Sequence, residues 1–349
     1  MRYIPVHQLE ENMILGQELY DADGRMLISK HTELTDENIA FIAFLGIPGV
    51  YIDDEFSEDI QIQEIIEPEV YKAAVQIIHR VFIYSMDEGT DNEEAALQEE
   101  VRKIVKATLK QKDVLYNLIN IKSYDGYTYF HSVNVAILSA VLGAKLHLSE
   151  EELMDLTTAG FLHDVGKVFV DPEIINAPRK LTPEERAMMM DHPRLAYDFL
   201  KTNYHFNENV LEAVYQHHEW YNGHGYPRRM EEKDISLLAR IIKVADVYDA
   251  MTGRRSYHEP YLPSDVLEYI MGRNGMEFDP EVVKLMIAEF CVYPVGCEVQ
   301  LSDGRHAVVL ENHRGTIMRP TIKLFGTEEI LNLTDDRSTW NITITKLLM

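Results

Sequence analysis

The sequence has few cysteines and few basic residues for its length. Only Cys291 and Cys297 occur among 349 residues. They are too few for a disulfide framework, so two free thiols in a reducing cytoplasm are the simplest interpretation. Lysine and arginine number 33 against 58 acidic residues, which gives a formal net charge of −25. This charge argues against binding of duplex nucleic acid, which needs a basic face, and an anionic ligand would have to find positive charge in metal ions or a few placed side chains.

Long apolar runs and the common nucleotide-binding loops are also missing. No stretch of eighteen or more apolar residues appears, so we expect no membrane span. The N-terminal sequence MRYIPVHQLEEN has no basic region followed by an apolar stretch, and we expect no signal peptide. No GxGxxG or Walker-type loop occurs, which argues against a nucleotide cofactor. Together these absences predict a cytoplasmic protein without a membrane segment.

Length and local patterns predict a mainly α protein made of several regions. At 349 residues the chain is too long for one ordinary core. Residues 1–65 should form a small α/β unit, because the turn DADG separates two apolar segments and residues 35–45 suit a short helix. We expect a helical connector at 66–112, an all-helical domain at 113–290 and a small β-module of short strands at 291–349.

The connector contains two amphipathic segments. Apolar residues recur at a spacing of four and three from Val70 to Tyr84, and again from Leu97 to Thr108. About two heptads in each segment are too few to argue for a coiled coil. The pattern favours a helical hairpin, or a helix that packs on the partner in a homodimer.

Histidines and aspartates recur in the helical region in a pattern that suits metal binding. The set comprises His131, His163, Asp164, His192, His217, His218 and Asp246. Adjacent residues of a helix point about 100° apart, so each adjacent pair could serve two ions. Imidazole and carboxylate without thiolate suit iron or manganese better than a structural zinc. We expect two divalent ions that share one carboxylate; the alternative is that these residues cap helices or lie as polar groups in the core.

Five short segments together resemble the HD-GYP family, a branch of the HD-domain metallohydrolases. They are YTYFHS at 127–132, HDVGK at 163–167, DHP at 191–193, HHEWYNGHGYP at 217–227 and ADVYDAMT at 245–252. The resemblance covers about residues 113–290, roughly half of the chain. It implies a cyclic di-GMP phosphodiesterase in which His131, His163, Asp164 and Asp246 hold one ion, while His192, His217 and His218 hold the second, with Asp164 bridging.

The resemblance also assigns residues to catalysis and to substrate binding. Lys167 matches a family lysine that faces the scissile phosphate, and we expect it on one helix face with His163. In GHGYP, the glycines would permit unusual backbone conformations and the close approach of a ligand, and the tyrosine would offer its ring or hydroxyl to a guanine or phosphate. The expected substrate contacts are Gly223, Gly225, Tyr226 and Pro227, together with Arg255, Arg179 and Lys180.

Three positions depart from the family pattern. Tyr127 stands where some relatives have a glutamate that binds a third metal, so we expect two ions. His258 replaces a second basic residue, and Ala177 stands where relatives often have lysine. These changes predict weaker substrate affinity or an altered preference.

The expected reaction is attack on phosphorus by a hydroxide that bridges the two ions, which yields pGpG and leaves open a second step to GMP. Three alternatives remain: a hydrolase of pGpG or of a mixed cyclic dinucleotide, a sensor that binds cyclic di-GMP without cutting it, and a di-iron oxygenase. Lys167 and the GHGYP segment favour phosphate chemistry over the oxygenase. The complete set of ligands argues against the sensor.

Overall fold

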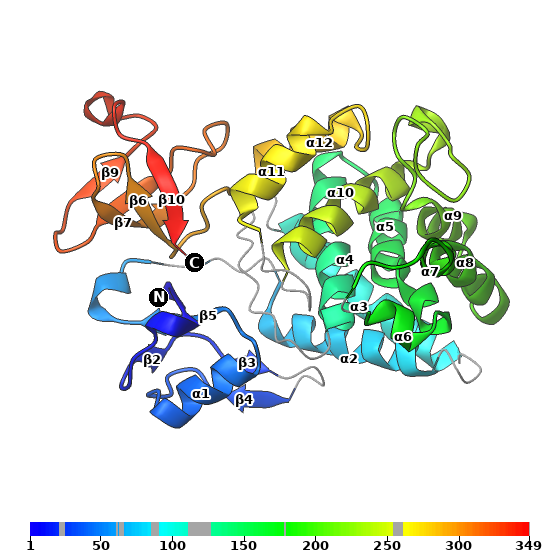
Figure 1. Ribbon diagram of the computed structural model, residues 1–349, viewed down its shortest axis with the longest axis horizontal. Coiled ribbons are helices and arrows are strands. Elements are labelled where there is room, and N and C mark those ends of the chain that lie inside the picture. Colours follow the sequence, from blue (N-terminus) through cyan, green and yellow to red (C-terminus); the bar gives the residue numbers. More distant parts are fainter. Residues whose placement is uncertain are drawn as a thin grey trace.

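Helices form most of the protein, and two small β-structures lie to one side of them (Figure 1). The computed structural model describes residues 1–20, 25–60, 62, 66–84, 91–110, 127–177, 179–253 and 261–348. The prediction of a mainly α fold is confirmed. Within these residues, no helix combines the length and the apolar character that crossing a bilayer requires.

The helical body is built around α4, whose residues from Phe130 to Ala144 are all buried. A helix that is buried on every side needs partners on every side, and α2, α3, α5, α10 and α12 pack around it. The body consists of α2 (Pro68–Tyr84), α3 (Asp91–Lys110), α4 (Tyr127–Lys145), α5 (Glu150–Leu162), α6 (Pro172–Ile175), α7 (Pro183–Met190), α8 (His192–Asn203), α9 (Glu208–Gln216), α10 (Leu237–Thr252), α11 (Pro263–Gly272) and α12 (Pro280–Glu289).

Local signals set where several of these helices begin. Ser149 and Thr182 each accept a hydrogen bond from the backbone N–H three residues later, and the glutamates there, Glu152 and Glu185, close reciprocal capping boxes. Helices α2 and α3 pack against each other, which confirms the predicted helical hairpin. Both helices also share one hydrophobic core with α4 and α5, while the proposed domain limits stay a prediction.

The N-terminal unit has a small core of its own. Strands β1 (Arg2–Pro5), β5 (Gly49–Asp53) and β2 (Ile14–Leu15) form one antiparallel sheet, β3 (Leu19–Tyr20) pairs with β4 (Met26–Ile28), and α1 spans Asp36–Phe44. The predicted hairpin and helix are therefore present, although the turn residues 21–24 lie outside the described residues. Leu15, Ile42, Val50 and Ile52 are buried in this core.

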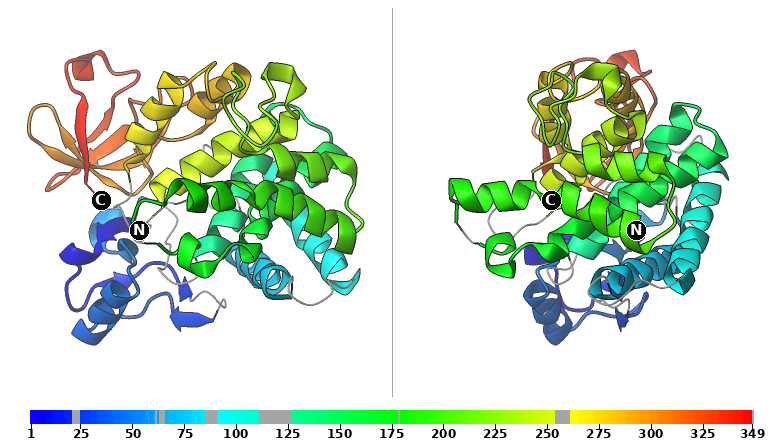
Figure 2. Two further views of the ribbon diagram at one scale, coloured as in Figure 1. Left: turned by 45° about the vertical axis from the view of Figure 1, so that its right-hand side comes forward. Right: turned by 90° about the vertical axis from the view of Figure 1, so that its right-hand side faces the viewer.

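The C-terminal β-module is a five-stranded antiparallel sheet that packs against the N-terminal unit. Its strands are β6 (Glu298–Leu301), β7 (His306–Glu311), β8 (Thr321–Leu324), β9 (Ile330–Asn332) and β10 (Ile344–Leu348), in the order β10-β6-β7-β8-β9. The Tyr3 N–H donates to the Gly296 carbonyl at 2.8 Å, and the rings of Phe56 and Phe325 stack with centroids 4.5 Å apart. The views in Figure 2 place both modules on the same side of the helices. Both cysteines are buried free thiols, as the sequence predicted.

Candidate metal centre

A buried cluster of imidazoles and carboxylates lies inside the helical body. His131 comes from α4 and Asp246 from α10, while the other members lie at helix ends: His163 and Asp164 follow α5, His192 begins α8, and His217 and His218 follow α9. The structure thus brings together all seven residues that the sequence singled out as ligands. Their polar atoms face one another even though they come from five separate segments.

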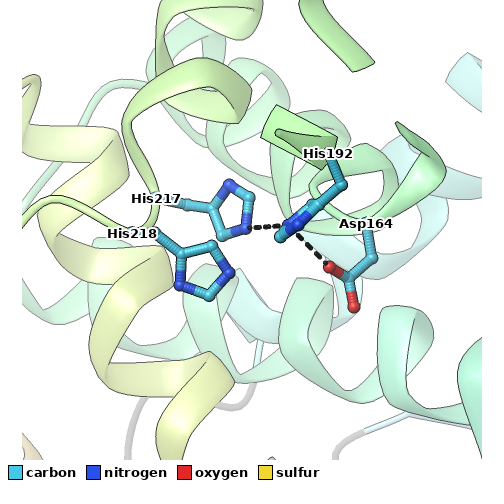
Figure 3. Close-up of side chains that lie close together, drawn as sticks. All are labelled: Asp164, His192, His217 and His218. Atoms are coloured by element: carbon cyan, nitrogen blue, oxygen red, sulfur yellow. Dashed lines mark hydrogen bonds and ion pairs between the residues drawn. The ribbon is translucent and has the colours of Figure 1, made fainter. Parts of the chain in front are cut away.

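Asp164 connects two groups of possible ligand atoms. It forms one group with His192, His217 and His218, shown in Figure 3, and another with His131 and His163. In each group the ligand atoms lie within 4.8 Å of one another. Asp246 adds a carboxylate to the second group, because its Oδ1 lies 3.2 Å from His131 Nε2 and 4.0 Å from His163 Nε2. The arrangement suits two cations with a shared carboxylate.

Three of the rings are oriented by helix C-termini. The Nδ1–H of His163 donates to the Gly160 carbonyl at 2.8 Å, that of His192 to Met189 at 2.8 Å, and that of His217 to Val214 at 2.6 Å. These carbonyls belong to the last turns of α5, α7 and α9, where helix carbonyls commonly need partners from outside the regular helix pattern. Because each Nδ1 carries the proton, the Nε2 of a neutral ring presents its lone pair to the cluster, as metal-binding histidines require.

Several ligand atoms of the cluster have no hydrogen-bond donor within reach in the described part of the chain, and a bound cation would satisfy them. His192 Nε2 lies 3.3 Å from His217 Nε2, and with both protons on Nδ1 two lone pairs face each other there. Among the described residues, His163 Nε2 and Asp164 Oδ1 are buried without a hydrogen bond. Buried polar atoms without partners are costly, so the residues present fit divalent cations.

Burial keeps three of the imidazoles neutral, and nearby positive charge keeps the Asp164 carboxylate ionised. Burial lowers the pKa of His192 to about 4, and burial also holds the pKa values of His217 and His218 well below the ordinary value. Burial alone would raise the pKa of Asp164, but the Lys167 ammonium and the nearby imidazoles hold it well below its usual range. At neutral pH these groups are therefore already in the protonation states that bind a metal.

Sequence comparison assigns a family to this part of the chain. Residues 113–282 match the family model described as HD domain. The matched residues include all five segments that resemble the HD-GYP family. The resemblance inferred from the five segments is thereby confirmed, and every ligand candidate lies within the matched residues.

Curated relatives are similar to the chain over the same region. The chain is 36% identical over 225 residues to a Pseudomonas aeruginosa protein named as a cyclic di-GMP phosphodiesterase. The aligned region covers 64% of this chain and 54% of that protein. It is 33% identical over 178 residues to a Vibrio cholerae protein named as a 3′3′-cGAMP-specific phosphodiesterase, covering 50% of this chain and 34% of that one. The chain thus spans about half or less of the length of these relatives.

A solved structure extends the similarity beyond the HD domain. It is described as an HD-GYP-type protein from Bdellovibrio bacteriovorus, with a TM-score of 0.52 at 17% identity. The match covers 81% of this chain and 96% of that chain. At this identity the similarity establishes the fold.

The backbone around two motifs differs from what we expected. The pairs His163-Asp164 and His217-His218 do not lie inside helices, since α5 ends at Leu162 and α9 ends at Gln216. The prediction that Lys167 shares a helix face with His163 is also wrong, because Lys167 lies in a 3-10 turn, Val165–Phe169. From this turn its Nζ reaches Asp164 Oδ2 at 2.5 Å.

The GHGYP segment folds back on the HHE turn that precedes it. Gly223 has a φ of +77°, which favours glycine, as predicted. A Cβ on Gly225 would lie 2.2 Å from the backbone nitrogen of Trp220. In this structure the close approach that glycine permits is therefore made by the protein's own backbone and not by a ligand. The Tyr226 ring stacks on His218, with centroids 4.7 Å apart. Pro227 follows through a cis peptide bond.

Two of the remaining substrate candidates, Arg179 and Lys180, do not join the cluster. Arg179 forms a two-pronged ion pair with Glu185, in which both N–O distances are 2.7 Å. Lys180 is exposed, and no described contact links either side chain to the cluster. Arg255 and His258 lie outside the described residues, as does the side chain of Tyr127.

Sequence reasoning missed three residues that hold the site in shape. Asp249, on α10, accepts a hydrogen bond from His131 Nδ1 at 2.8 Å. Glu219 is buried and accepts from the backbone N–H groups of Arg228 and Met230, at 2.6 and 3.2 Å. Gly166 lies against the first turn of α8. The only sequence signal for Asp249 was its position one turn after Asp246 in ADVYDAMT.

We expect Asp249→Ala to weaken metal binding. The carboxylate fixes the His131 ring and directs its Nε2 toward Asp246 and Asp164, and loss of such support typically costs roughly 10–100-fold in metal affinity. Titration of manganese(II) into the metal-free protein would measure the loss. Asp198→Ala, at an exposed ion pair on α8, is the control that should leave affinity unchanged; equal affinities for all three proteins would contradict the role of Asp249.

We expect Gly166→Ala to destabilise the protein by about 1–3 kcal/mol. A Cβ there would lie 2.0 Å from the His192 carbonyl oxygen and 2.6 Å from the Ala196 nitrogen, both backbone atoms. The close contact between Gly166 and α8 keeps Asp164 Oδ1 at 3.4 Å from His192 Nε2. Because a side chain at position 166 would push these two ligand residues apart, metal binding should weaken too. Chemical denaturation and metal titration test this, with Gly272→Ala as control because nothing lies within 4 Å of its Cβ. An unchanged midpoint and affinity for Gly166→Ala would refute the packing argument.

Proposed function

We propose that this protein hydrolyses a 3′–5′ phosphodiester bond of cyclic di-GMP to give pGpG, with two divalent metal ions as cofactors. The observation that carries the proposal is the placement of Asp164 in both groups of ligand atoms. The names of the curated relatives support the substrate class.

In this proposal each ion has its own set of protein ligands. His131, His163, Asp164 and Asp246 would hold one ion, and His192, His217 and His218 would hold the other together with Asp164. Oxygen and imidazole ligands without thiolate favour iron or manganese. When bound, such ions activate water and neutralise charge on the phosphoryl oxygens.

The chain's own side chains would then position the substrate and stabilise charge. Lys167 has 27% of its side chain exposed, and its ammonium lies beside Asp164. From there it could stabilise the charge that develops on a phosphoryl oxygen. The GHGYP loop, Gly223 to Pro227, would form one wall for the nucleotide, with the Tyr226 hydroxyl or its outer ring face as a contact. Arg255, Arg179 and Lys180 stay proposed phosphate contacts, and Arg179 would first have to leave Glu185.

A second substrate is supported by one specific finding. The Vibrio cholerae relative is named for 3′3′-cGAMP, and the departures at Ala177 and His258 affect positions expected to contact phosphate. We therefore propose hydrolysis of a mixed cyclic dinucleotide as the second candidate. The cytoplasmic location, the homodimer and the lack of duplex nucleic-acid binding stay predictions.

The function is tested by turnover of three substrates. Protein reconstituted anaerobically with iron(II) or manganese(II) would be incubated with cyclic di-GMP, 3′3′-cGAMP and pGpG, and the products would be separated by chromatography. We expect pGpG from cyclic di-GMP and loss of activity on chelation. Tight binding of cyclic di-GMP without product would support a sensor instead, and oxygen consumption without phosphodiester cleavage would support an oxygenase.

A further inference from the structure

His218 differs from the other imidazoles of the cluster in how its ring is held. The rings of His163, His192 and His217 are each fixed by a hydrogen bond from Nδ1 to a backbone carbonyl, and the ring of His131 by one to Asp249. Among the described residues, no hydrogen bond joins the His218 ring to the protein. Its direction must therefore be set by packing.

Tyr226 supplies that packing. Its ring lies nearly parallel to the His218 ring, at an interplanar angle of 21° with centroids 4.7 Å apart. The rings of His192 and His217 also approach His218, but at angles of 88° and 45° and from within the ligand cluster itself. The Tyr226 N–H also donates to the His218 carbonyl at 3.2 Å. One residue thus contacts both the backbone and the ring of His218.

The surrounding loop holds Tyr226 in this position. On one side of Tyr226, Gly225 lies so close to Glu219 and Trp220 that any side chain at 225 would collide with their backbone. On the other side, the buried Glu219 carboxylate binds the backbone N–H groups of Arg228 and Met230. Because both anchors belong to the residues directly after His218, the loop can only close with the Tyr226 ring next to His218.

We propose that Tyr226 is a positioning residue that orients the His218 imidazole toward the metal ion. The inference rests on the proposed function, in which His218 is a ligand. It gives the tyrosine of the GHGYP loop a task that precedes substrate binding. The stacked ring is what matters for this task, so the phenol hydroxyl is dispensable for metal binding.

The test compares metal affinity in variants at position 226. Manganese(II) would be titrated into metal-free wild type, Tyr226→Leu and Tyr226→Phe, and the cobalt(II)-loaded proteins would be compared by visible absorption. We expect Tyr226→Leu to weaken binding of one of the two ions by roughly tenfold and to change the cobalt spectrum. Tyr226→Phe keeps the ring and should match wild type in both measurements. Tyr197→Leu, in the middle of α8 with its hydroxyl bonded to Lys201 and Glu208, is the control for loss of a tyrosine ring.

His218→Ala, measured in parallel, separates the two ways in which the inference could fail. If His218→Ala binds both ions as wild type does, the assignment of His218 as a ligand is wrong, and the proposed function fails with it. If His218→Ala loses an ion but Tyr226→Leu does not, only the positioning role is overturned. Should Tyr226→Leu not fold, Tyr226→Phe still decides, because a weakened affinity or an altered cobalt spectrum in that variant contradicts a role for the ring alone.

Discussion

Replacing Asp164 with asparagine should remove both metal ions and lower turnover of cyclic di-GMP by at least about a thousand-fold. Asp164 is the one residue that belongs to both groups of ligand atoms. Asparagine keeps the shape of the side chain but removes the negative charge that two neighbouring cations would share. Metal content by elemental analysis and product formation under saturating substrate would measure the two effects.

Asp155→Asn is the matched control for this variant. Asp155 is also a buried aspartate of the α5 segment, but its carboxylate accepts hydrogen bonds from Asn207 and Asn209, at 2.8 and 3.1 Å. Its replacement should cost about 1 kcal/mol of stability and leave metal content unchanged. If Asp164→Asn kept both ions and near wild-type turnover, the shared carboxylate would have no role.

Lys167→Met should retain both ions and yet lower kcat by roughly 100–1000-fold, as expected when a charge that stabilises a developing anion is removed. Its ammonium lies 2.5 Å from Asp164 Oδ2 and is partly exposed beside the cluster. A loss of kcat with little change in metal affinity would separate this role from metal binding. Steady-state kinetics on metal-loaded protein, together with metal titration, would measure both.

Lys201→Met provides the comparison for Lys167→Met, because Lys201 is exposed on α8 and its ammonium donates to the Tyr197 hydroxyl at 2.7 Å, away from the cluster. This variant should keep wild-type kinetics. An equal kcat for Lys167→Met and wild type would show that the lysine only pairs with Asp164. Loss of the ions in Lys167→Met would instead make it a support for the metal centre.

The membership of the candidate site could be predicted from sequence because its residues occur in short, specific segments. Each of the five segments contributed a side chain that the structure brings into the cluster. The starts of α5 and α7 could also be predicted from the sequence, because Ser149 and Thr182 each precede a glutamate by three residues. Such signals are local, because the capping hydrogen bonds join residues within one turn of helix.

The ends of α5 and α9 could not be predicted in the same way. Neither end carries the glycine or proline that usually marks a helix C-terminus. Instead His163 and His217 close their own helices by donating from Nδ1 to a carbonyl of the last turn. These histidines can cap helices and also bind metal, because the two ring nitrogens act separately. Nδ1 donates to the helix carbonyl, and Nε2 faces the cluster.

Other features depended on contacts between distant segments. The pairing of His131 with Asp249 spans 118 residues, and spacing along the chain carried no sign of it. Gly166 belongs to the HDVGK segment, but glycine is required there because a Cβ would collide with the His192 carbonyl oxygen of α8. Arg179 was a candidate for phosphate binding through the resemblance to the HD-GYP family, and its ion pair with Glu185 followed only from the fold.

Metal analysis of anaerobically purified protein, coupled to product identification with cyclic di-GMP, is the most direct test of a metal centre built around Asp164. We expect two iron or manganese ions per chain and conversion of cyclic di-GMP to pGpG that stops on chelation and resumes when metal is restored. Protein that binds no more than one ion, or that cuts cyclic di-GMP equally well after chelation, would contradict it.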